Sequence, residues 1–257
     1  MPPISGVVLL TDRRMLPRGG ELVRTVAAAV AGGVRWVLLR ELDLPRTERL
    51  ALAGELRPIL AEAEGILAVA GPDPLIDTDT LPAGPPVVLH LSAAGPYPPP
   101  AADLVGRSCH DEAELRRLST EDYVTLSPVY PTRSKPGYGP PLRPDGLADL
   151  IRLSPVPALA LGGIETPAQV RACVEAGAAG VAVLGAIMRA TDPAQTAAAL
   201  TTAFHQAATP KPQSRQLPTG KATTGLRPTV STEGSSLTAR SGHGRPQPST
   251  ATTEGET

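Results

Sequence analysis

The sequence has few aromatic residues, few cysteines and no excess of either charge. Only 2% of its 257 residues are aromatic, it holds two cysteines, and its formal net charge is −1. Scarce aromatics argue against a base-stacking surface, and near-neutral charge gives no electrostatic reason to expect nucleic acid or an anionic membrane as a partner. The cysteines, Cys109 and Cys173, form neither a disulfide framework nor a metal-ligand spacing.

Long apolar runs and targeting signals are lacking as well. No stretch of 18 uncharged apolar residues occurs, so we expect no transmembrane helix. The N-terminus has no basic segment followed by an apolar one, so we expect no signal peptide. Two cysteines without a disulfide framework fit a reduced compartment, so we expect a cytoplasmic location. The composition leaves a homo-oligomer open.

The composition changes near residue 207. Residues 208–257 are rich in Thr, Ser, Pro and Gly, with six Lys or Arg and three Glu, so this segment carries +3 and residues 1–207 carry −4. Its scattered aliphatic residues cannot bury enough apolar surface to offset chain entropy. We therefore expect a disordered tail, with a regulatory or docking tail as the alternative.

Within residues 1–207, short apolar runs alternate with segments of helical spacing. Eight such repeats predict a parallel sheet that closes into a (β/α)8 TIM barrel. An open, doubly wound sheet is the alternative, but no GxGxxG follows the first strand. The expected strands are 6–12, 34–41, 66–70, 87–91, 104–109, 123–129, 156–161 and 180–184, and the expected helices are 21–31, 47–63, 111–118, 145–153, 166–176 and 192–207.

Glycines follow the last two expected strands. Gly162 and Gly163 end the seventh strand, and Leu184 and Gly185 end the eighth. In a TIM barrel, phosphate sites recur after these two strands, where glycine lets backbone N–H groups approach an anion. The alternative is that the glycines serve turns with positive φ. Their occurrence at both strands favours a phosphate site.

The segment after the sixth expected strand is rich in donors. Thr132 and Ser134 carry hydroxyl groups, and Arg133 and Lys135 carry positive charge. Dispersed donors of this kind suit an oligophosphate. Glycines at 137 and 139 would allow the loop to act as a lid, and a solvated basic loop is the alternative.

Further polar residues stand at other strand ends. Arg40 ends the second expected strand, where its neighbour Glu41 is a candidate partner in an ion pair. Ser108 and His110 alternate near the end of the fifth, so they should face the same side. His90 lies near the end of the fourth. A lone histidine on a strand is more often structural than catalytic, so we do not place either histidine in the catalytic set.

Several segments in the same order resemble the thiamine phosphate synthase/thiazole tautomerase family. They are Leu9-Leu-Thr-Asp12, Leu39-Arg-Glu41, Gly106-Arg-Ser-Cys-His110, Ser127-Pro-Val-Tyr-Pro-Thr-Arg-Ser-Lys135, Leu161-Gly-Gly-Ile164 and Gly180-Val-Ala-Val-Leu-Gly-Ala-Ile187. The resemblance implies a TIM barrel that joins an aminopyrimidine diphosphate to a thiazole phosphate, both phosphorylated small molecules. It also implies that diphosphate leaves with Mg²⁺ assistance and that the thiazole nitrogen captures the resulting pyrimidine cation.

The resemblance also implies roles for single residues. Arg40, Ser108 and Lys135 match catalytic positions around the diphosphate. The remaining matches are to phosphate-binding positions. Thr132 and Ser134 match the loop that holds the thiazole phosphate, and Gly162 or Gly163 with Leu184 and Gly185 match its phosphate cradle.

The sequence departs from the family pattern where the family binds metal. The family has Gln-x-Arg-x-Lys in the second strand, and here Leu38 and Leu42 replace the Gln and the Lys. Both Mg²⁺-binding aspartates, after the third and fourth strands, are missing from their usual places. Asp73, or Asp43, is a candidate substitute ligand.

These departures keep alternatives open. One is a catalytically impaired homologue that binds thiamine phosphate or thiazole phosphate. Another is a thiazole tautomerase, in which His90 or His110 would supply acid–base chemistry. A Schiff-base aldolase using Lys135 is a remote further alternative.

Overall fold

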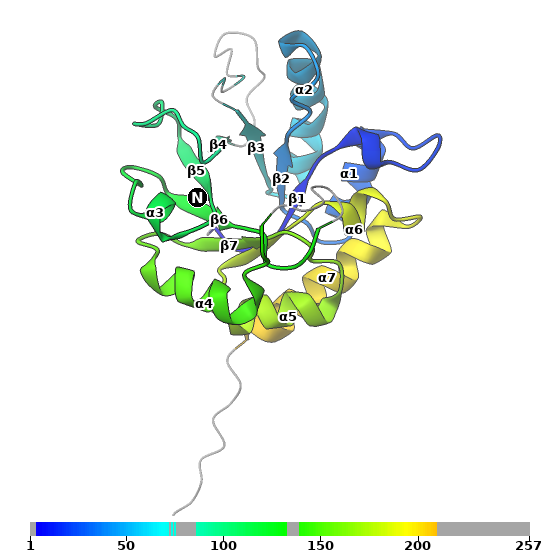
Figure 1. Ribbon diagram of the computed structural model, residues 1–257. Coiled ribbons are helices and arrows are strands. Elements are labelled where there is room, and N and C mark those ends of the chain that lie inside the picture. The colour runs from blue at the N-terminus through cyan, green and yellow to red at the C-terminus, as the bar shows by residue number, and fades with distance from the viewer. Residues whose placement is uncertain (1–3, 72, 74, 76–85, 133–138, 210–257) are drawn as a thin grey trace, which may run out of the picture. The chain divides into compact units, whose positions relative to one another are not determined.

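The computed structural model describes residues 4–71, 73, 75, 86–132 and 139–209. Eight parallel strands form a closed barrel in chain order, and the last strand pairs with the first (Figure 1). This confirms the predicted TIM barrel and rules out the open sheet. The strands are β1 (Gly6–Leu10), β2 (Trp36–Leu39), β3 (Ile66–Ala70), β4 (Val87–Leu91), β5 (Leu104–Cys109), β6 (Tyr123–Leu126), β7 (Ala158–Leu161) and β8 (Gly180–Val183).

Helices surround this barrel on the outside (Figure 1). Three helices differ from the sequence prediction. The helix expected over 111–118 is a single turn, and two further short helices, η1 and α6, were not predicted because one turn is too short to show a helical period. The helices are η1 (Arg13–Met15), α1 (Leu22–Ala31), α2 (Arg46–Glu62), α3 (Glu112–Leu115), α4 (Arg143–Leu153), α5 (Pro167–Glu175), α6 (Gly185–Met188) and α7 (Pro193–Ala208).

The apolar runs form strands because both of their faces are buried. On β1, Leu9 packs outward against the helices, whereas Val8 and Leu10 point into the barrel. The same alternation continues on β2, where Leu39 faces outward and Leu38 inward. A strand covered on both faces gains from an apolar residue at every position, which explains the unbroken apolar runs of the sequence.

The loop from β4 to β5 contains no helix and is held by a buried cation. Arg107 of β5 is 0% exposed and forms an ion pair with Glu121, which is also buried. Its guanidinium donates to the carbonyl oxygens of Ser92 at 3.0 Å and Pro96 at 2.8 Å, and lies 3.8 Å from the ring centroid of Tyr97. A buried ion pair on the outward face of β5 thus fixes a loop at the carboxyl end of the barrel.

The predicted tail, residues 208–257, begins as α7 ends at Ala208, and from residue 210 onward it lies outside the described residues. Its predicted disorder therefore stays a prediction. Over the ranges that the structure describes, no helix is both long and apolar enough to cross a membrane.

Candidate active site

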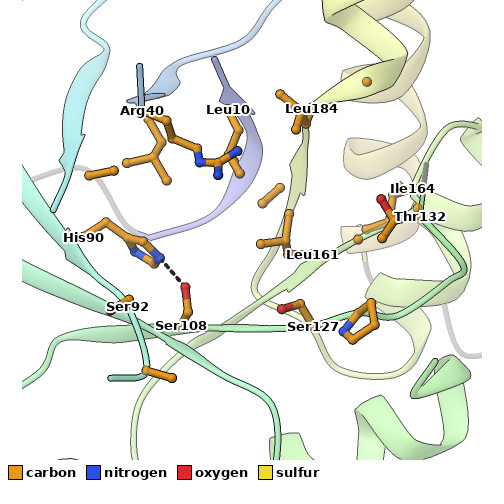
Figure 2. A pocket seen from close by; sticks show the side chains of 18 of the residues that line it. Leu10, Arg40, His90, Ser92, Ser108, Ser127, Thr132, Leu161, Ile164 and Leu184 are labelled. Carbon is orange, nitrogen blue, oxygen red and sulfur yellow. Dashed lines mark hydrogen bonds between the residues drawn. The ribbon is translucent and has the colours of Figure 1, made fainter. Parts of the chain in front are cut away.

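A pocket of about 560 Å³ opens at the carboxyl ends of the strands, where TIM barrels place their active sites. Its floor is made of apolar side chains that point inward from the strands (Figure 2). Polar groups stand around this floor, so a ligand would meet an apolar base and a polar rim. The floor residues are Leu10, Leu38, Ala70, Leu161 and Ala182.

Arg40 brings a positive charge to the rim. It directly follows β2, and its backbone N–H donates to Oγ1 of Thr11 at 3.0 Å. Its half-buried guanidinium lines the pocket and forms no ion pair with any residue that the structure describes. It is therefore available to an anionic ligand, and its predicted role at the diphosphate stays a prediction.

The pairing of Glu41 with Arg40 is wrong. Glu41 binds Arg13 instead, with 3.0 Å between Oε2 and Nη1, and it also accepts from the Arg13 backbone N–H. Successive side chains at a strand end point to opposite faces, so Arg40 faces the pocket while Glu41 faces away from it.

Ser108 and His90 point into the pocket from β5 and β4 (Figure 2). Nε2 of His90 is 3.1 Å from Oγ of Ser108, and Nδ1 is 3.1 Å from Oη of Tyr123 on β6. Burial, with a smaller effect from the positive charges of Arg40 and Arg107, lowers the pKa of His90 to about 4. The imidazole is therefore neutral near pH 7.

His110 lines the same pocket, as its alternation with Ser108 predicted. Its ring Nδ1 and backbone N–H both contact Oε2 of Glu114, at 2.8 and 2.7 Å. Glu114 is the residue whose backbone N–H donates to the cap residue Asp111 of α3. The helix cap thus holds His110 at the rim of the pocket.

The loop after β6 is described in part. Thr132 lines the pocket beside Ser127 and Pro128. The other predicted phosphate contacts of this loop, Arg133, Ser134 and Lys135, lie outside the described residues, and so does Gly137 of the predicted lid. Their predicted roles stay predictions.

Gly162 and Gly163 line the pocket, and the fold also requires glycine at both positions. Both have positive φ, +102° and +66°. A Cβ at Gly162 would overlap Pro128, and one at Gly163 would overlap the carbonyl oxygens of Tyr130 and Pro131. The loop after β6 thus packs directly on this turn. Glycine at these two positions can therefore serve the turn and also let a phosphate approach the backbone.

Leu184 and Gly185 border the pocket after β8, next to a second cation. Arg189, the residue directly after α6, lines the pocket and binds Glu165 with 2.7 Å between Nη2 and Oε1. A Cβ at Gly185 would overlap the Arg189 guanidinium. Glycine at this position therefore makes room for a positive charge beside the predicted phosphate cradle.

The described residues do not fit a Mg²⁺ site. Among them, no three His, Cys, Asp or Glu side chains come together in a group that could hold a metal. Asp73 pairs with Arg46 at 2.8 Å, and Asp43 pairs with Arg13 at 2.8 Å; neither lines the pocket. Glu165 is the one carboxylate on the described pocket wall.

Three residues at this site were not predicted from the sequence: Tyr123, Glu165 and Arg189. Tyr123 shares the inward face of β6 with Thr125 and Ser127, so the two-residue period of a strand could have found it. Arg189 follows Gly185 by four residues, which is one helical turn. Without α6 in the predicted elements, that spacing carried no signal.

Comparison with known proteins agrees with the fold and with the motifs. Residues 99–187 match a family model described as "Thiamine monophosphate synthase". A protein of Geobacter sulfurreducens is 36% identical over 204 residues, 75% of this chain and 91% of that protein. The thiamine-phosphate synthase of Roseiflexus castenholzii is 33% identical over 217 residues, 77% of this chain and 88% of that protein.

A solved structure supports the same fold. The thiamine phosphate pyrophosphorylase of Pyrococcus furiosus superposes with a TM-score of 0.63 at 22% identity, covering 79% of this chain and 96% of that one. At this identity the structural likeness shows the barrel alone. The relatives from Geobacter sulfurreducens and Roseiflexus castenholzii are 36% and 33% identical over 91% and 88% of their own length, which shows the family as well as the fold. By this measure, the chain belongs to the thiamine-phosphate synthase family.

Proposed function

We propose that the protein is a thiamine-phosphate synthase. As such it would be a transferase of thiamine biosynthesis that joins an aminopyrimidine diphosphate to a thiazole phosphate and releases diphosphate. The observation that carries the proposal is Arg40, a rim guanidinium without an ion pair among the described residues, above an apolar floor in a chain of this family.

The reaction needs charge to be stabilised in two places. As the bond between the pyrimidine methylene carbon and the diphosphate oxygen breaks, negative charge collects on the diphosphate and positive charge on the pyrimidine. The thiazole nitrogen then donates its lone pair to that carbon. Arg40 and the Ser108 hydroxyl stabilise the leaving diphosphate from the β2 and β5 sides of the pocket.

The apolar floor has its own function in this scheme. A carbocation reacts with water, and the side chains of Leu10, Leu38 and Leu161 keep water from the base of the pocket. The phosphate of the thiazole would lie at the opposite rim, near Thr132, Gly162 and Gly163. We assign no step to Mg²⁺, because the described residues offer no carboxylate set to hold it.

Turnover of the two substrates tests this proposal. The purified full chain is incubated with both substrates, once with Mg²⁺ and once with a chelator, and thiamine phosphate and diphosphate are measured. Product in at least one condition, and its loss in Arg40→Met, would support synthase activity. No product above background in either condition would overturn it.

A second candidate is a homologue that binds the phosphorylated compounds without joining them. The lack of a metal-binding carboxylate set among the described residues favours it. Calorimetry with thiamine phosphate separates the two. Tight binding without turnover supports the binding protein, whereas turnover excludes it.

A further inference from the structure

Three side chains form a hydrogen-bonded chain across neighbouring strands inside the barrel. Oη of Tyr123 is 3.1 Å from Nδ1 of His90, and Nε2 of His90 is 3.1 Å from Oγ of Ser108. Tyr123 and His90 are buried, and Ser108 reaches the pocket (Figure 2). A serine beside a histidine is also the arrangement of an activated nucleophile, so the position of one proton decides what Ser108 can do.

The phenol of Tyr123 determines where that proton lies. Burial raises the pKa of Tyr123, so the hydroxyl keeps its proton. Among the residues that the structure describes, its hydrogen-bond partner is Nδ1 of His90 alone. A buried O–H without an acceptor is costly, so Tyr123 donates to Nδ1. A neutral imidazole carries one proton, which must then sit on Nε2.

The proton on Nε2 sets the hydrogen bonding of Ser108. Nε2–H donates to Oγ of Ser108, and Oγ1 of Thr125, 3.4 Å from the same oxygen, donates to it as well. Both lone pairs of the serine oxygen are then engaged. Its own O–H has no remaining direction except toward the pocket.

We propose that Tyr123 and His90 are positioning residues that fix Ser108 as a hydrogen-bond donor toward an oxygen of the bound diphosphate. The same arrangement prevents His90 from acting as a general base for Ser108, because Nε2 has no lone pair to accept the serine proton. The identity of the ligand rests on the proposed function, whereas the direction of the hydrogen bonds does not.

Nitrogen NMR of the full chain at pH 7 tests the tautomer without any substrate. The chain has four histidines, and loss of one set of signals in His90→Gln assigns those of His90. We expect Nε2 to show the shift of a protonated nitrogen and Nδ1 that of an unprotonated one. In Tyr123→Phe, Nδ1 loses its donor and a mixture of tautomers should appear. A proton on Nδ1, or a mixture, in the unaltered chain would overturn the proposal.

Binding of inorganic diphosphate, measured by calorimetry, tests the donor. Ser108→Ala should weaken it about tenfold, the worth of one hydrogen bond to a charged group. His90→Gln keeps an N–H donor and should weaken it less than His90→Leu. Circular dichroism checks that each variant is folded, and unaltered binding in a folded Ser108→Ala overturns the proposal. These outcomes are independent of turnover, so a failed synthase assay with the expected tautomer contradicts only the proposed function.

Discussion

Gly185 and Arg189 share one space at the rim of the barrel: the guanidinium of Arg189 occupies the position that a side chain on Gly185 would fill. Arg189 thereby lines the same pocket as Gly162 and Gly163, with Glu165 as its ion-pair partner. A substrate phosphate at this rim would find a positive charge that family resemblance did not predict.

Arg189→Met is therefore expected to raise KM for the thiazole phosphate about five- to tenfold. In a binding assay, the Kd for the thiazole phosphate should rise by the same factor. Gly185→Ala should have a similar effect, because its methyl group displaces the guanidinium. Glu165→Gln is the matched control: it releases Arg189 from its carboxylate and should leave affinity equal or tighter. No effect of Arg189→Met, or weaker affinity in Glu165→Gln, would contradict this role.

Arg40 is expected to matter for chemistry and little for stability. Arg40→Met should lower kcat/KM about 100-fold, the effect of losing one positioned group that stabilises developing negative charge. Because Arg40 has no ion pair within the described chain, urea unfolding should change by less than about 0.5 kcal/mol. Arg40→Lys keeps the charge but not the planar pair of donors, so partial activity should remain. Equal activity in Arg40→Met and the unaltered chain would remove Arg40 from the mechanism.

Arg107, unlike Arg40, is expected to matter for the stability of the fold. Arg107→Met leaves the carboxylate of Glu121 buried without its cation and frees the carbonyl groups of Ser92 and Pro96. Breaking a buried pair in this way costs about 3–5 kcal/mol of unfolding free energy. The double variant Arg107→Met with Glu121→Met should recover much of this loss. A single variant that loses less than about 1 kcal/mol would show that the pair does not hold this end of the barrel.

His90 is expected to make stability depend on pH. Its pKa of about 4 in the folded protein lies below the ordinary value of about 6.5, chiefly through burial. The unfolded chain therefore binds more protons between these pH values, and the free energy of unfolding falls as pH falls through this range. For this one group the loss between pH 7 and 4.5 is about 2 kcal/mol.

Urea unfolding at these two pH values, in the unaltered chain and in His90→Gln, isolates this contribution, since all other titrating groups are common to both. The variant should lose about 2 kcal/mol less on acidification. An equal loss in both proteins would mean that the pKa of His90 is not depressed by its burial.

Much of the fold could be predicted because local patterns suffice for it. The strand at 66–70 has the expected bounds, since a strand buried on both faces leaves an unbroken apolar run. The strands at 87–91 and 104–109 also have the expected bounds, although His90, Arg107 and Ser108 interrupt their apolar residues. The helix expected from residue 166 does start there: Thr166 is its N-cap residue, and its side chain accepts from the Gln169 backbone N–H. α6 was missed because four residues cannot display a period.

The sequence by itself determined the barrel, its family and the place of Arg40 and Ser108 at strand ends, because strand alternation and chain order are local properties. The tertiary structure decided which groups meet. It paired Glu41 with Arg13, placed Arg189 over Gly185, and brought Tyr123, His90 and Ser108 from three strands into one chain. Such contacts depend on barrel closure and on which face each side chain takes, and no spacing within a single segment encodes them.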